Sequence, residues 1–272
     1  MTQKRKSNNT TAISTKPLPK KKIFPFNSLP AEIKNQIYEL ALTAEDGIFL
    51  ISKTKHYRRT IQRDMPSFPH SVRGSTKIRR RYGNVFGGGQ ASEDFAGSAE
   101  PPELTALAPN ILLLNREIYA QARPFLYSSN SFFLEDTTAL HAFLSNIGPK
   151  NCASLTDLTI RGWGYSKAHK AMNHPAFTML ASAINLERLY IDCRIHQGQP
   201  MSTARQFYRD GFHYLEGIGT AKGRFDAAVN VIEISPENVE SHRYRSDGTD
   251  EHSVEERMEQ FRGELRKLLS SH

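Results

Sequence analysis

The side chains that could do chemistry are carboxylates, histidines and two cysteines, and they are spread widely along the chain. Asp157, Asp192 and Glu233 fall on successive predicted strands, where aligned carboxylates could form an acidic site. Each of them alternates with apolar neighbours, so a solvent-facing position on a strand explains each residue more simply. We therefore do not expect these three residues to form a catalytic site.

The histidines and cysteines lack the spacing of a metal site or an activated nucleophile. His169 and His174 are five residues apart and His213 is distant, which does not match the spacing of metal ligands. Cys152 and Cys193 are the only cysteines, and two isolated thiols favour a reducing compartment, the cytoplasm or the nucleus. With no Gly-x-Ser-x-Gly sequence either, we expect no enzyme, no metal and no cofactor. The enzymatic alternative is a hydrolase or transferase whose site is scattered through the sequence.

Positive charge is concentrated in two segments of this chain of 272 residues, whose formal net charge is +8. Residues 1–22 contain seven Lys/Arg and no acid, and residues 53–82 contain ten against the single Asp64. The N-terminal segment is predicted to be a disordered tail, and its basic runs suit either a nuclear import signal or a solvated end. No apolar run approaches the roughly 20 residues that span a bilayer, so we expect no membrane association.

Two helices are predicted to pack together in the N-terminal part of the chain. The first spans Phe24–Leu42, with Pro30 at its first helical position. The second begins near Asn110, and Pro124 should kink or end it near Arg123, after which Ser131–Leu134 is a buried strand. Its apolar face is expected to contain Ile111, Leu114, Ile118, Ala122 and Phe125.

Between these helices, the sequence predicts a β-hairpin and a mobile basic insert. Gly47–Ser52 is apolar and β-branched, Tyr57–Arg63 alternates, and four residues, KTKH, lie between the two strands. Residues 65–107 then lose all periodicity and contain the runs KIRRR and GGG. The glycine run lacks the lysine of a phosphate-binding loop, so we expect it to be only flexible.

After residue 135, helix-then-strand units follow one another and predict a small, mostly parallel sheet with helices on one face. The fold class is therefore mixed α/β. The strand spacing is too irregular for a regular leucine-rich repeat, although the arrangement is similar to one. The expected domains are a basic tail at 1–22, a helical unit at 23–135 with hairpin and insert at 53–107, helix–strand repeats at 136–240, and a polar loop with an amphipathic helix at 241–272.

The two N-terminal helices carry motifs that resemble those of a known family. FNSLPAEIKNQIYELAL at 26–42 and LLLNREIYAQARPFLYSSN at 112–130 resemble the F-box-like domains of filamentous-fungal proteins, of the two-EXR type and of a related family of unknown function. Lys34 stands where that motif usually has arginine, which keeps the charge and loses the bidentate fork. The resemblance implies docking on the small adaptor of a cullin-type ubiquitin ligase, with the C-terminal repeats engaging a target.

The expected partner-binding residues lie at the start of the first helix and along it: Leu29, Pro30, Ile33, Ile37 and Tyr38. We expect Ile33 and Ile37 to pack on the second helix, which would leave Leu29, Tyr38 and Ala41 as the exposed apolar set. The sequence thus favours a non-enzymatic interaction scaffold. The alternative is a nuclear or nucleic-acid-associated protein that uses its basic segments, because Tyr57 and Tyr82 lie among arginines.

Overall fold

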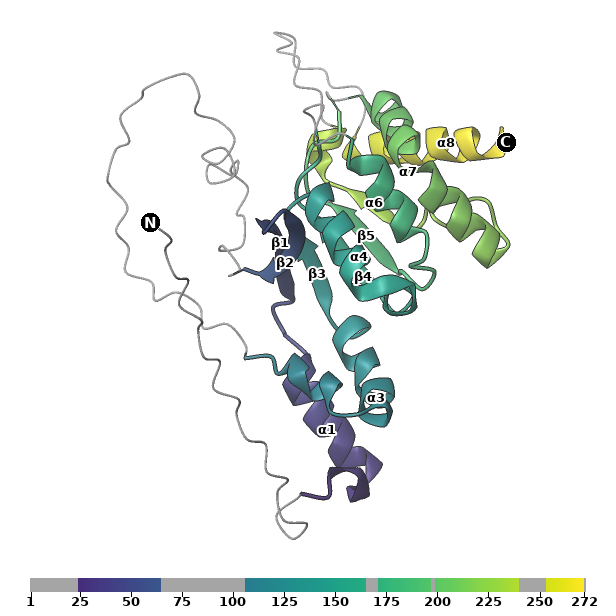
Figure 1. The fold of residues 1–272 in the computed structure, drawn as a ribbon. Coiled ribbons are helices and arrows are strands. Elements are labelled where there is room, and N and C mark those ends of the chain that lie inside the picture. Colours follow the sequence, from purple (N-terminus) through teal and green to yellow (C-terminus); the bar gives the residue numbers. More distant parts are fainter. Residues whose placement is uncertain (1–23, 65–105, 165–170, 197–198, 240–252, 272) are drawn as a thin grey trace, which may run out of the picture.

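The computed structural model describes residues 24–64, 106–164, 171–196, 199–239 and 253–271 (Figure 1). The expected basic tail, the mobile insert with its KIRRR and GGG runs, Tyr82 and His169 lie outside these ranges. Within them the protein is a mixed α/β structure, as the sequence predicts, and its central element is a mostly parallel sheet of six strands.

The sheet has the strand order β2-β1-β3-β4-β5-β6, and only β1 and β2 are antiparallel. The strands are β1 (Ile48–Lys55), β2 (Arg58–Arg63), β3 (Ser131–Leu134), β4 (Asp157–Ile160), β5 (Arg188–Ile191) and β6 (Ile232–Ile234). Alternate residues such as Phe132 and Leu134 are buried, which is the period of two that the sequence shows.

The predicted hairpin is confirmed, but it is not separate from the C-terminal sheet. β1 pairs in parallel with β3, Ile48 beside Phe132, so one sheet runs through the expected boundary at residue 135. The turn contains only His56 and Tyr57, because β1 continues to Lys55 and pairs there with Arg58. The expectation of a four-residue connection is therefore wrong.

Helices cover one face of this sheet (Figure 1). The connections from β3 to β4, from β4 to β5 and from β5 to β6 each contain one of them: α4 (Thr137–Cys152), α6 (Asn173–Leu180) and α7 (Pro200–Lys222). Gly148, with a φ of +75°, divides α4 into two helical parts. α8 (Val254–Ser270) packs on α7, and Phe261 contacts Phe207 at a ring-centroid distance of 6.4 Å. Trp163 packs against Phe177 and Phe207, as expected for a buried loop aromatic.

The N-terminal helices form a small unit with its own core. The unit contains the 3-10 helices η2 (Phe26–Ser28) and η3 (Pro109–Leu113) and the helices α1 (Ala31–Leu42) and α3 (Arg116–Tyr127). Its fully buried residues are Tyr38, Leu42, Ile118 and Ala122, which form a cluster distinct from the main core. Another 3-10 helix, η4 (Pro236–Asn238), follows β6.

The second N-terminal helix differs from the expected one at both ends. The Asn115 side chain accepts a hydrogen bond from the Ile118 amide and caps α3, so Leu114 precedes the helix and is 63% exposed. Pro124 lies inside α3, which continues to Tyr127. The Asn130 amide donates to the carbonyl oxygens of Phe125 and Leu126, and these contacts stabilise the last turn. The expectation that Leu114 is core is wrong, and of the two outcomes expected at Pro124, a kink or an end of the helix, the end is wrong.

The two free thiols should differ in reactivity. Burial raises the pKa of Cys152 to about 12, so its thiol stays protonated at neutral pH, whereas Cys193 is half-buried. At pH 8 we expect a chromogenic disulfide reagent to modify Cys193, and to modify Cys152 only after denaturant unfolds the chain. Two thiols that react at the same rate in the native protein would contradict the burial of Cys152.

Candidate interaction surfaces

The first candidate surface is the outer side of α1. Ile33, Ile37 and Leu40 are spaced four and three residues apart, so they lie on one side of the helix, and we call them the outer stripe. Ile33 is 42% exposed and Leu40 is 80% exposed, while Ile37 is half-buried. Leu29 is half-buried and Pro30 is exposed where α1 begins. The outer stripe is therefore an apolar strip that the described part of the protein leaves largely uncovered.

The opposite side of α1 forms the core of the helical unit. Tyr38 is 0% exposed, and its ring lies 5.7 Å from that of Phe125 and 6.0 Å from that of Phe26. Its hydroxyl donates to the Gln121 side chain at 3.2 Å. Ala41 also packs against this core. The expected assignment of the two faces is thus reversed, and Tyr38 is a core residue that is not available to a partner.

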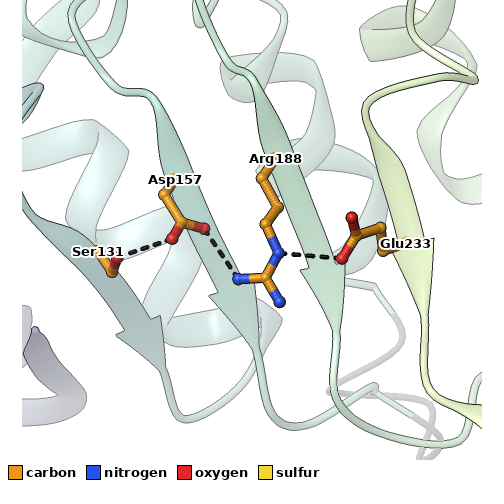
Figure 2. Close-up of polar contacts among 4 residues, drawn as sticks. All are labelled: Ser131, Asp157, Arg188 and Glu233. Atoms are coloured by element: carbon orange, nitrogen blue, oxygen red, sulfur yellow. Dashed lines mark hydrogen bonds and ion pairs between the residues drawn. The ribbon is translucent and has the colours of Figure 1, made fainter.

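The second candidate surface is the face of the sheet opposite the helices. A row of polar side chains runs across strands β3 to β6, the last of which is an edge strand (Figure 2). The Ser131 hydroxyl donates to Asp157 at 2.7 Å, and Arg188 contacts Asp157 at 3.4 Å and Glu233 at 2.9 Å. These side chains come from β3, β4, β5 and β6, and the register of the sheet places Ser131, Asp157 and Arg188 side by side.

Arg188 is the centre of this polar row. Burial lowers its pKa, but the hydrogen bond to Glu233 and the nearby charge of Asp157 outweigh that effect and raise the pKa above its usual value. The guanidinium also lies 5.0 Å from the centre of the Tyr190 ring. Arg188 is therefore a fixed positive charge that holds the carboxylates of two neighbouring strands. The period-two pattern of β5 could have indicated this role, because Arg188 is the polar residue that opens that strand.

The three carboxylates considered from the sequence do not share a site. Asp157 opens β4, whereas Asp192 follows the far end of β5 and is exposed. Arg188 lies between Asp157 and Glu233 and pairs with both, so neither is arranged with Asp192 around a common space. Asp157 and Glu233 are strand positions on the face away from the core, as expected, whereas Asp192 lies just beyond β5. Within the described ranges, no group of three or more His, Cys, Asp or Glu residues is arranged to hold a metal.

Aromatic side chains extend the open face of the sheet toward the hairpin. The rings of Phe49 and Phe133 stack at 4.5 Å, and the Arg161 guanidinium lies 5.7 Å from the centre of the Phe49 ring.

On the helical side, the His174 and His213 rings are 5.1 Å apart, and both lie near Phe212. The histidines are thus part of an aromatic contact between α6 and α7.

Comparisons with known proteins identify one family. Residues 20–182 match the model of a family described as a domain of unknown function (DUF7730), a range that extends from before α1 to just after α6. No curated protein and no solved structure matches the chain. Among the residues that the structure describes, no helix is long and apolar enough to cross a membrane.

Proposed function

The chain belongs to the family described as a domain of unknown function (DUF7730), and from its own surfaces we propose that it is a non-enzymatic protein-interaction scaffold. In this proposal the helical unit is F-box-like and docks on the adaptor of a cullin-type ubiquitin ligase through the outer stripe of α1. The leucine-rich-repeat-like half would present a target. Such a scaffold would act in the cytoplasm or the nucleus.

The observation that carries this proposal is that α1 has two apolar sides and buries only one. A helix on the surface of a globular protein usually has one apolar stripe, which faces the core. In α1, Tyr38 and Leu42 already fill that role, so the core of the unit does not account for the outer stripe. Single exposed apolar residues are common, but two exposed residues, Ile33 and Leu40, that flank the half-buried Ile37 on one helical side form a strip typical of an interaction site. An amphipathic helix in a partner groove would use this spacing.

The choice of a cullin-ligase adaptor as the partner follows from the sequence resemblance. Leu29 and Pro30 precede α1 as they do in that motif, and both remain at least partly accessible. The polar row on the sheet supports a separate role for the C-terminal half. Its alternating charges and half-exposed side chains suit a protein surface of mixed polarity.

A binding measurement with paired variants tests the docking role of the outer stripe. We expect the purified chain to bind a cullin-ligase adaptor, and Ile33→Ser with Leu40→Ser to weaken that binding about 30-fold, because two central apolar contacts are lost. The matched control, Asn35→Ser with Glu39→Gln, changes two exposed polar residues of the same helix and should bind like wild type. Melting temperatures should stay close in both, since exposed side chains contribute little to stability.

The same measurement contains the outcomes that would reject the proposal. Wild-type protein that does not bind the adaptor would remove the ligase role. Equal binding by wild type and by the variant Ile33→Ser with Leu40→Ser would show that the adaptor uses another surface. A loss in the control variant as well would assign the effect to α1 as a whole rather than to its outer stripe.

A further inference from the structure

A second surface with its own chemistry is the end of the hairpin, residues 53–59, which we call the basic arm. β1 pairs with β3 only over Ile48–Leu50, whereas its pairing with β2 continues to Lys55. The basic arm is therefore a two-stranded ribbon that extends beyond the six-stranded sheet, at the β2 edge (Figure 1). All of its residues are exposed.

The basic arm is positively charged without compensation nearby. It contains Lys53, Lys55, Arg58 and Arg59, and neither strand of the hairpin contains an acidic residue. Within the described ranges, none of these four cations forms an ion pair. Exposed charges of one sign repel one another, so the arrangement opposes the stability of the arm unless an anion binds there.

The backbone of the turn in the basic arm is strained, which lowers the stability of the hairpin. His56 and Tyr57 have φ values of +49° and +62°, in the left-handed region that Asn-Gly turns adopt with less strain. The Tyr57 side chain projects from this turn and is fully exposed, at 104% of its reference area. Backbone strain that holds an exposed aromatic residue among cations points to a use for that side chain.

We infer that the basic arm binds single-stranded nucleic acid, with Lys53, Lys55 and Arg58, which the strand register places on one face of the hairpin, on the phosphates and the Tyr57 ring stacked on a base. An acidic peptide would also neutralise the charges, but it does not present a planar ring at every residue on which the exposed tyrosine could stack. Every nucleotide has both a negative charge and a stacking face. This surface is separate from the outer stripe of α1, so nucleic-acid binding and adaptor docking can be lost independently.

Fluorescence anisotropy with a labelled single-stranded RNA of mixed sequence tests the inference on the full chain. With three phosphate contacts, the logarithm of the affinity should fall with that of the salt concentration at a slope of about −2. The variant Lys53→Gln, Lys55→Gln, Arg58→Gln should bind at least about tenfold more weakly, with a shallower slope. The charge-matched control Arg79→Gln, Arg80→Gln, Arg81→Gln should keep most of the affinity.

A second variant separates the contribution of Tyr57 to RNA affinity from the contribution of the cations. His56→Asn with Tyr57→Gly installs the sequence that this turn prefers, so we expect a higher melting temperature together with at least about a fivefold loss of RNA affinity. A gain in stability with unchanged affinity would overturn the stacking role of Tyr57. The inference also fails if binding does not depend on salt, if only the 79–81 control loses affinity, or if polyglutamate competes as well as RNA.

Discussion

Replacing Ile118 by aspartate should unfold the helical unit formed by α1, η3 and α3. The Ile118 side chain is 3% exposed in the small core that also contains Tyr38 and Leu42. Losing its burial costs roughly 1.5–3 kcal/mol, and an unpaired carboxylate in that position adds a further penalty of several kcal/mol. The total is comparable with the whole stability of many domains, about 5–15 kcal/mol.

Circular dichroism during urea unfolding would measure this effect. The matched control is Leu113→Asp, which makes the same type of change in the same unit at a side chain that is 82% exposed. We expect the control to unfold close to wild type and Ile118→Asp to have lost helical signal before urea is added. If both variants unfold like wild type, Ile118 does not belong to a packed core.

Replacing Asn130 should have the next largest effect, because one side chain ties three segments together. Its amide donates to the carbonyl oxygen of Leu42 at 2.8 Å and to that of Leu126 at 2.8 Å, and its oxygen accepts from the Ala44 amide at 2.7 Å. The residue is 2% exposed, so water cannot replace these bonds. Asn130→Ala should destabilise the protein by about 3 kcal/mol or more, since each unsatisfied buried group costs about 1–3 kcal/mol.

A comparison of substitutions separates the contribution of the Asn130 hydrogen bonds to stability from the contribution of its side-chain volume. Asn130→Asp keeps the shape but supplies no hydrogen to the carbonyl groups and introduces a buried charge, so it should destabilise more than alanine does. Ser129→Ala, at the exposed neighbouring position, should leave the denaturation midpoint unchanged. An aspartate variant as stable as wild type would show that the amide donors contribute nothing.

The strands and most helices could be predicted because their burial follows simple periods. Buried and more exposed residues alternate in β5 and β6, and three of the four residues of β4 are buried. Helix–strand alternation also predicted the parallel pairing. The inclusion of the hairpin in the same sheet could not be predicted. Ile48–Leu50 of β1 pairs with Phe132–Leu134 of β3, and residues so far apart in the sequence leave no local signal of their pairing.

The candidate site was harder to predict because both sides of α1 are apolar. Ile33, Ile37 and Leu40 have the spacing of a core face, and so do Tyr38, Ala41 and Leu42. Periodicity cannot choose between them, and branched aliphatic residues suggested the wrong side. Which side of α1 is buried depends on shape: the Tyr38 ring packs against Phe26 and Phe125, and its hydroxyl donates a hydrogen bond to Gln121. These partners are known only once the chain is folded.

Hydrogen exchange with and without the ligase adaptor is the most direct test of the proposal that α1 is a docking helix. Binding through the outer stripe should slow exchange of the backbone amides in Ala31–Leu42, because a bound partner suppresses local opening of that helix. The hairpin strands β1 and β2 should exchange as they do in the free chain. If saturating adaptor slows exchange only outside α1, or slows it nowhere, the result would contradict the account.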